Sequence, residues 1–317
     1  MNYELKKGLL WAEWAMLAYV LFTLLLMAWH WQELVSPATM LWGRLGAVAM
    51  TLVLWRVYRR WPSRWTLLLR VVGQMGLLAW WYPDTYELNR CLPNLDHLFA
   101  ASEQAVFGCQ PALLFCQRCP QPVVSELLSL GYVSYYPLIV LVTLYYFFRR
   151  PDRFLDAVYI IMASFFLFYV IFDLLPVVGP QFYYEAVGTD AIAQGHFPDL
   201  GLYFRDHQAC LDIPGWKDGV FYHLLVDAHN AGERPTAAFP SSHVGIVAVL
   251  LWLAWASRCR RLFWTIVPFA VLMLFATVYI YAHYAVDAIA GLFVGTLFYF
   301  ILKLCTKNVS AVWSSRW

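Results

Sequence analysis

The sequence predicts an all-α, polytopic membrane protein, a helical bundle of about eight transmembrane helices with both termini in the cytoplasm. Three observations carry this prediction. Of the 317 residues, 62% are apolar and only 13% are charged, whereas soluble domains are about half apolar and about a quarter charged. The apolar residues also form long runs. A two-domain soluble enzyme is therefore excluded, and the net charge of +2 provides no field that would attract nucleic acid.

Each expected transmembrane helix is an apolar run long enough to cross a bilayer, which takes about 20 residues. In chain order the runs cover residues 9–29, 39–58, 65–81, 128–148, 154–177, 243–257, 262–281 and 284–304. The first run is longer than the core of a signal peptide and lacks a clear cleavage site, so we expect it to stay in the mature protein.

The basic residues orient these spans. If the N-terminus is cytoplasmic, fifteen of the 22 basic residues fall on the cytoplasmic side, as the positive-inside rule requires. They are Lys6, Lys7, Arg56, Arg59, Arg60, Arg64, Arg149, Arg150, Arg153, Arg258, Arg260, Arg261, Lys303, Lys307 and Arg316. Segments 82–127 and 178–242 then lie outside, and the second, rich in acids, glycine and proline, is expected to form a structured cap.

We expect two regions in the chain. Residues 1–127 form an N-terminal three-span region with an outer, cysteine-containing segment, and residues 128–317 form the catalytic bundle with the cap. Five of the seven cysteines lie in the outer segments, which predicts one or two disulfides in an oxidising compartment. A zinc site at Cys116-x-x-Cys119 is disfavoured because no second pair accompanies it.

Charged groups inside the spans are few. Arg44 and Arg70 lie near span ends, where we expect them to extend toward the interface, and Glu13 lies early in the first span. Asp173, near the outer end of the fifth span, is either structural or part of a site.

Two histidines mark the candidate site. The sixth span opens with Pro240-Ser241-Ser242-His243, and the eighth opens at His283-Tyr284 with Asp287 following. The chain crosses inward and returns between them, so both histidines are expected at the same outer depth. On one helix His283 and Asp287 would share a face, so that the carboxylate accepts a hydrogen bond from one ring nitrogen and the other attacks.

This arrangement indicates phosphoryl transfer. Pro240 suits the first turn of a helix, whose free N–H groups, with the hydroxyls of Ser241 and Ser242, would bind phosphate. We expect His283 to be the nucleophile, oriented by Asp287, and His243 to be the general acid and then base. The chemistry requires no metal and no ATP, and we expect no cofactor. The other six histidines are read as structural: His30, His97, His196, His207, His223 and His229.

At these residues the sequence resembles the type 2 phosphatidic acid phosphatase superfamily, over about residues 154–304, through Pro240-Ser241-Ser242-His243 and His283-Tyr284-Ala285-Val286-Asp287. The phosphatase branches also carry Lys-x6-Arg-Pro and an Arg six residues before the last His. Neither is present, because position 277 is Thr277 and Arg234-Pro235 follows Asp227 at the spacing of the Lys. The remaining pattern, with 169–180 and Tyr135-Tyr136-Pro137, looks like the inositol phosphorylceramide synthase branch.

That resemblance implies a phosphotransferase of sphingolipid metabolism. Phosphatidylinositol would donate phosphoinositol to His283, diacylglycerol would leave, and ceramide or dihydroceramide would accept the headgroup. Arg234 and Arg205 are candidates to replace the missing cations, and Asp173 and Tyr284 are further candidates for substrate binding.

Two other functions stay open. A lipid phosphatase acting on phosphatidate or a polyprenyl pyrophosphate is disfavoured by the missing cations, and a non-catalytic transporter or scaffold by the complete histidine site. A CDP-alcohol phosphotransferase and a nucleotide hydrolase are excluded for lack of their motifs. The single Asn-x-Ser/Thr signal, Asn308-Val309-Ser310, falls on the cytoplasmic side. This favours a bacterial inner membrane with a periplasmic site over a Golgi membrane with a lumenal site.

Overall fold

The structure, a computed structural model, describes residues 8–314, and the regular elements of that range are all helices, with no strand. The all-α prediction is confirmed. The α-helices are α1 (Trp11–Trp29), α2 (Pro37–Arg60), α3 (Arg64–Asn89), α4 (Asp96–Phe107), α5 (Pro111–Arg118), α6 (Pro122–Val133), α7 (Tyr135–Arg149), α8 (Phe154–Leu174), α9 (Pro180–Val187), α10 (Thr189–Ala193), α11 (Val220–Gly232), α12 (Ser242–Ala256), α13 (Arg260–Tyr279) and α14 (Ala285–Ser314). A 3-10 helix, η2, covers Tyr203–Arg205.

Five helices in residues 8–314 are long and apolar enough to cross a membrane: α1, α2, α8, α13 and α14 over Ala285–Thr306. Helices α6 and α7 add a sixth span if they are counted as one, bent by 46°. The expected count of eight is therefore too high by this measure. Helix α12 has 15 residues and rises only about 22 Å, whereas the hydrocarbon core is about 30 Å thick. The apolar run of α3 is interrupted by Arg70 and Gln74.

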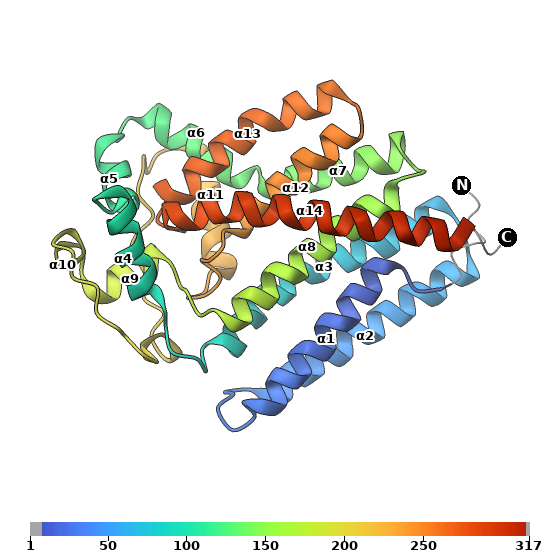
Figure 1. Ribbon diagram of the computed structural model, residues 1–317, viewed down its shortest axis with the longest axis horizontal. Coiled ribbons are helices and arrows are strands. Elements are labelled where there is room, and N and C mark those ends of the chain that lie inside the picture. Colours follow the sequence, from blue (N-terminus) through green and yellow to red (C-terminus); the bar gives the residue numbers. More distant parts are fainter. Residues whose placement is uncertain (1–7, 315–317) are drawn as a thin grey trace.

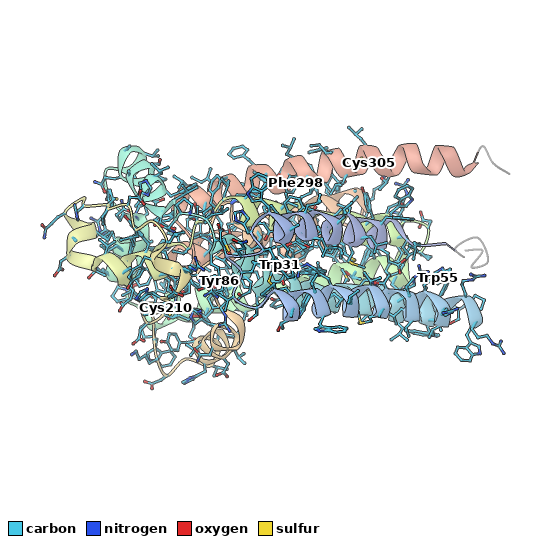
Figure 2. The ribbon with its side chains drawn as sticks, turned by 90° about the horizontal axis from the view of Figure 1, so that it is seen from below. Trp31, Trp55, Tyr86, Cys210, Phe298 and Cys305 are labelled. Carbon is cyan, nitrogen blue, oxygen red and sulfur yellow. The ribbon has the colours of Figure 1, made fainter. Side chains whose placement is uncertain are left out.

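The two ends of the molecule differ in construction (Figure 1). Helix α1 begins and α14 ends at one end, whereas α4, α5, α9 and α10 gather at the other. Figure 2 shows Cys305 and Trp55 toward the first end and Cys210 toward the second. The Arg150 guanidinium donates to the Ser257 carbonyl at 3.1 Å, so the basic turns after α7 and α12 meet. Lys6, Lys7 and Arg316 lie outside the described residues.

Helices α1, α2 and α3 share buried ion pairs. The Arg70 guanidinium donates to both carboxylate oxygens of Glu13, and both side chains are fully buried. Arg44 pairs with Asp84 at 2.7 Å and also donates to Thr23 at 3.0 Å. The expectation that both arginines extend toward the interface was wrong. Each has a carboxylate partner on a neighbouring helix, so the charge is neutralised inside the bundle without reaching water.

The outer cysteines are free thiols, as are the other two, so the predicted disulfides are absent. Their partners lie on other elements. Cys116 Sγ lies 2.9 Å from the Tyr281 hydroxyl, and Cys210 Sγ lies 3.8 Å from His229 Nε2. The presence of five cysteines on one side of the membrane does not by itself bring any two of their Cα atoms within disulfide range.

Glycines allow α12 and α14 to cross in close contact. An added Cβ at Gly295 would lie 2.1 Å from the Gly245 carbonyl oxygen, and one at Gly291 would lie 2.3 Å from the Ser241 carbonyl oxygen. Gly291 and Gly295 form the small-xxx-small spacing that brings membrane helices together. The crossing therefore fixes where α12 begins relative to the first turns of α14, and it places the two predicted motifs side by side.

Candidate active site

His283 lies in the turn between α13 and α14, with 3% of its surface exposed. Its Nδ1 lies 2.7 Å from the Ala238 carbonyl oxygen. Because a carbonyl only accepts, Nδ1 carries the proton and Nε2 keeps its lone pair. Burial lowers the pKa of His283 to about 4, so the ring is neutral near pH 7. The backbone N–H of His283 donates to the Thr277 carbonyl at 3.0 Å, which fixes the turn.

Asp287 lies in the first turn of α14 and is fully buried. One carboxylate oxygen accepts from the Tyr284 backbone N–H at 2.9 Å and lies 3.9 Å from His283 Nδ1. The expected single helix carrying both groups was wrong, because α14 begins at Ala285, after His283. Asp287 therefore caps its own helix, and the ring of His283 is oriented by the Ala238 carbonyl, while the carboxylate lies close enough to stabilise a positive ring.

His243 faces His283 from the first turn of α12. The two ring centroids are 5.9 Å apart, nearly perpendicular, so the predicted meeting of the two histidines is confirmed. Tyr132 and Tyr135 pack on the His243 ring at 4.7 and 4.5 Å. They flank the break between α6 and α7, where the bend turns both rings toward the site. The Nδ1 atom of His243 is buried and has no hydrogen-bond partner in residues 8–314.

The start of α12 differs in one detail from the sequence prediction. Ser241 is the N-cap, and its hydroxyl accepts from the Val244 backbone N–H at 3.4 Å. Pro240 therefore precedes the cap and is not in the first turn. Among the described residues, no acceptor bonds the backbone N–H groups of Ser242 and His243. These two donors at the positive end of the helix are the groups that could bind a phosphate oxygen.

A third segment completes the site. Gly179 has a φ of +89°, and an added Cβ would lie 2.7 Å from the Ala282 carbonyl oxygen. The backbone N–H of Ala238 donates to the Val177 carbonyl at 3.0 Å, and that of Gln181 to the Tyr281 carbonyl at 2.9 Å. The segment that follows α8 thus packs directly on the turn that carries His283. Position 179 requires glycine because its φ is positive and because a Cβ would collide with this turn.

Two buried carboxylates of α4 were missed by the sequence reasoning. Asp96 accepts from the Tyr284 hydroxyl at 3.0 Å, and Glu103 accepts from the backbone N–H groups of Ala285 and Val286 at 3.0 and 3.1 Å. Burial raises the pKa of Glu103 to about 7. Their spacing of seven residues could have indicated a shared role, because it places both acids on one face of a helix.

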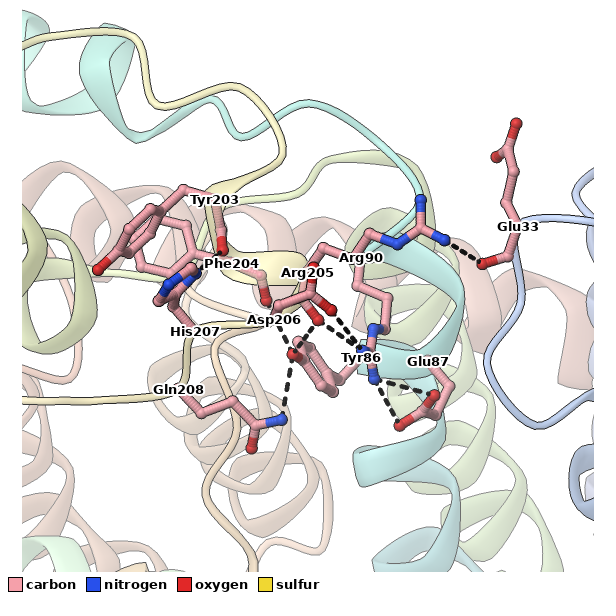
Figure 3. A network of polar contacts seen from close by, with 10 residues as sticks. All are labelled: Glu33, Tyr86, Glu87, Arg90, Tyr203, Phe204, Arg205, Asp206, His207 and Gln208. Carbon is pink, nitrogen blue, oxygen red and sulfur yellow. Dashed lines mark hydrogen bonds and ion pairs between the residues drawn. The ribbon is translucent and has the colours of Figure 1, made fainter.

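The four residues predicted to bind substrate lie in different parts of the structure. Tyr284 is buried beside His283. Asp173 accepts from the Tyr19 hydroxyl of α1 at 2.9 Å, and the exposed Arg234 donates to the Glu233 carbonyl. Arg205 donates to the Glu33 carbonyl at 3.1 Å in the loop between α1 and α2 (Figure 3).

The same network holds the cap to α3. The Tyr86 hydroxyl donates to the Phe204 carbonyl at 2.8 Å, and Arg90 donates to the Arg205 carbonyl (Figure 3). Arg205 thus anchors the cap between α3 and the loop after α1. Among the described side chains, no Lys or Arg makes a hydrogen bond or ion pair with His243, His283 or Asp287.

Fold and site together define a helical membrane protein with two facing histidines at a helix start. The chain matches the model of the PAP2 superfamily over residues 97–301, and it therefore belongs to the PAP2 superfamily. Members of this superfamily are phosphatases or phosphotransferases, so the protein is a membrane-embedded phosphatase or phosphotransferase. The match begins in α4, well before residue 154, where the motif resemblance was expected to start.

A solved structure with a similar chain is the first transmembrane PAP2 type phosphatidylglycerolphosphate phosphatase from Bacillus subtilis. The two chains are 18% identical over 68% of this chain and 94% of the other, with a TM-score of 0.38. A likeness of this size carries no conclusion about substrate. No curated protein matches the chain.

Proposed function

We propose that the protein is a lipid phosphotransferase that moves phosphoinositol from phosphatidylinositol to ceramide or dihydroceramide through a phosphohistidine at His283. The observation that carries the proposal is the hydrogen bond from His283 Nδ1 to the Ala238 carbonyl. It leaves the Nε2 lone pair free on a neutral ring, beside a second histidine 5.9 Å away. A neutral, oriented imidazole with an acid–base partner is what nucleophilic catalysis at phosphorus requires.

In the first half-reaction, Nε2 of His283 attacks the phosphorus of the donor lipid. The N–P bond forms, and the bond from phosphorus to the diacylglycerol oxygen breaks. His243, which takes up a proton when the negatively charged phosphate binds beside it, gives that proton to the leaving oxygen. The ring of His283 becomes positively charged while Nδ1 keeps its proton. The Asp287 carboxylate, 3.9 Å from Nδ1, stabilises this charge. The free N–H groups of Ser242 and His243 bind the phosphoryl oxygens, with the Ser241 and Ser242 hydroxyls beside them.

In the second half-reaction, His243 removes the proton from the primary hydroxyl of the sphingolipid. The resulting oxygen attacks phosphorus, the N–P bond breaks, and His283 returns to its neutral form. Protons balance over the two steps, because His243 gives one to diacylglycerol and takes one from the acceptor. Tyr132 and Tyr135 both pack against the His243 ring, which preserves its orientation between the steps.

The charges around the site favour a diester donor over a phosphomonoester. Asp96, Glu103 and Asp287 are all fully buried in and behind the His283 turn, and no cation pairs with them among the described side chains. A phosphomonoester carries about −1.5 to −2 charges near neutral pH, whereas a phosphodiester carries one. The second charge would be placed near three carboxyl groups without the cations of the phosphatase branches.

We place Tyr284 in the substrate pocket wall, and we keep Arg234 near the headgroup as a cation at the open end of the site. For Arg205 and Asp173 the hydrogen-bond partners are Glu33 and Tyr19, so we assign both to fixing the cap and α8. We propose an N-terminal region of residues 1–127 and a catalytic bundle of residues 128–317, with α4 acting with the bundle because its acids bond the residues that follow His283. We propose a bacterial inner membrane, with the cap end in the periplasm.

A comparison of donors and acceptors tests the proposal. Purified protein in mixed micelles without divalent metal is given fluorescent ceramide with phosphatidylinositol, or phosphatidate alone. We expect phosphoinositol ceramide from the wild type and from His223→Ala, an exposed histidine used as the control, and none from His283→Ala. Phosphate release from phosphatidate without a ceramide product would establish the phosphatase. Activity that survives His283→Ala would contradict the phosphohistidine.

A further inference from the structure

Helix α4 reaches the catalytic turn with two acids that lie about 180 residues earlier in the chain. Asp96 and Glu103 are seven residues apart, on one face of the helix, and neither has any exposed surface. Every oxygen of the two carboxylates accepts a hydrogen bond. Burying an acid destabilises the fold unless its oxygens are hydrogen-bonded. Because all four oxygens are bonded here, the two carboxylates attach α4 to the segments that donate to them.

Asp96 joins two loops. One oxygen accepts from the Gly179 backbone N–H at 2.8 Å and the Tyr284 hydroxyl at 3.0 Å, and the other accepts from the Val178 N–H and the Asn94 side chain, both at 2.7 Å. Gly179 in turn packs against the Ala282 carbonyl. The residues before and after His283 are therefore both held, directly or through Gly179, by this one carboxylate.

Glu103 holds the start of α14. Its two oxygens accept separately from the Ala285 and Val286 N–H groups, which have no partner within the helix. Carboxylates usually cap a helix from the residues just before it. Here the cap comes from a separate helix, so the position of α4 decides where α14 begins and, two residues earlier, where His283 lies.

We propose that Asp96 and Glu103 are positioning residues: α4 acts as a two-point clamp that holds His283 in line with His243 during transfer. Neither acid contacts the reacting atoms; each acts through the backbone of the turn. Loosening the turn leaves lipid binding intact but moves Nε2 away from its line of attack, and a misplacement of about 1 Å can cost about 100-fold in rate. The kinetic part of this inference rests on the proposed function of His283.

The chain contains a matched control. Glu126 of α6 accepts from the Phe221 and Tyr222 N–H groups at 3.1 and 2.9 Å, at the start of α11. It is the same type of cap from a separate helix, but it holds a helix that carries none of the proposed catalytic groups. Glu103→Gln and Glu126→Gln each replace a carboxyl group, whose two oxygens accept one backbone N–H each, by an amide that can accept only through its single oxygen.

The experiment measures kcat and KM for transfer, thermal unfolding in detergent, and amide exchange of the segment containing Ala285 and Val286. For Glu103→Gln we expect kcat to fall about 10- to 100-fold, KM to stay within about twofold, and exchange of this segment to accelerate. For Glu126→Gln we expect kcat within about twofold of the wild type. Asp96→Asn should follow Glu103→Gln, and Tyr284→Phe should show a smaller loss.

Two results would overturn the clamp. One is a folded Glu103→Gln protein with kcat and exchange like the wild type. The other is an equal loss of kcat in Glu103→Gln and Glu126→Gln, which would reduce the effect to general stability. Failure of the proposed function is separate: it appears as activity in His283→Ala, while the exchange measurement on Ala285 and Val286 still decides whether α4 holds the turn.

Discussion

Replacing Gly291 by alanine should disable the site by moving its two halves apart. The added Cβ would lie 2.3 Å from the Ser241 carbonyl oxygen, whereas ordinary contacts begin at 3.4 Å. The opposing atoms are backbone at the start of α12, so no side chain can rotate away. The helices must separate by about 1 Å, and Ser241 is two residues before His243. A shift of this size between reacting groups costs about 100-fold in rate.

The control is Gly46→Ala in α2, where an added Cβ meets no atom within 4 Å. Alanine there should stabilise the helix by about 0.5–1 kcal/mol. Gly291→Ala should lose about 1–3 kcal/mol to overpacking and still fold. The assay is headgroup transfer in micelles, with thermal unfolding measured on the same samples. A Gly291→Ala protein with wild-type kcat would refute the reasoning that the glycine crossing sets the distance between the histidines.

Three other predictions follow from buried groups. Arg70→Met should destabilise the protein by about 3–5 kcal/mol, because it leaves the Glu13 carboxylate unpaired; an unchanged unfolding temperature would contradict this. The pKa of Glu103 is raised from 4.5 to about 7, so ionising it costs wild-type stability as pH rises through that range. Relative to the wild type, Glu103→Gln should therefore gain about 3 kcal/mol between pH 4.5 and pH 8 in unfolding measurements, and a constant difference would be incompatible with the raised pKa. With the pKa of His283 lowered to about 4, its ring nitrogen signals should not titrate between pH 5.5 and pH 8 in nitrogen NMR, and a midpoint near 6.5 would show a solvated ring.

The sequence was sufficient for the parts of the fold that depend on local pattern. Apolar runs placed the helices, and the return of the chain between His243 and His283 predicted that the two rings meet, as their 5.9 Å separation confirms. The same reasoning failed where helix boundaries mattered. His283 lies just before α14, so the spacing of four to Asp287 did not produce the direct hydrogen bond expected for a shared helix face.

The sequence pattern could not predict which residues far apart in the chain form ion pairs or hydrogen bonds. The arginines of α2 and α3 lie near span ends, which suggested interfacial side chains, but their acids come from α1 and the far part of α3. Asp96 and Glu103 resemble ordinary loop acids until α4 is seen against α14. Pairings of this kind depend on how helices distant in the chain pack together, and no periodicity within one helix records them.

The most direct test of the central claim is to isolate the covalent intermediate. The protein is mixed with phosphatidylinositol without ceramide, quenched at alkaline pH, where phosphohistidine survives, and digested for mass spectrometry. We expect phosphoinositol on the peptide containing His283, its disappearance when ceramide is added before the quench, and its absence in His283→Ala. An adduct on a different residue, or ceramide product formed with no adduct under any quench condition, would contradict it.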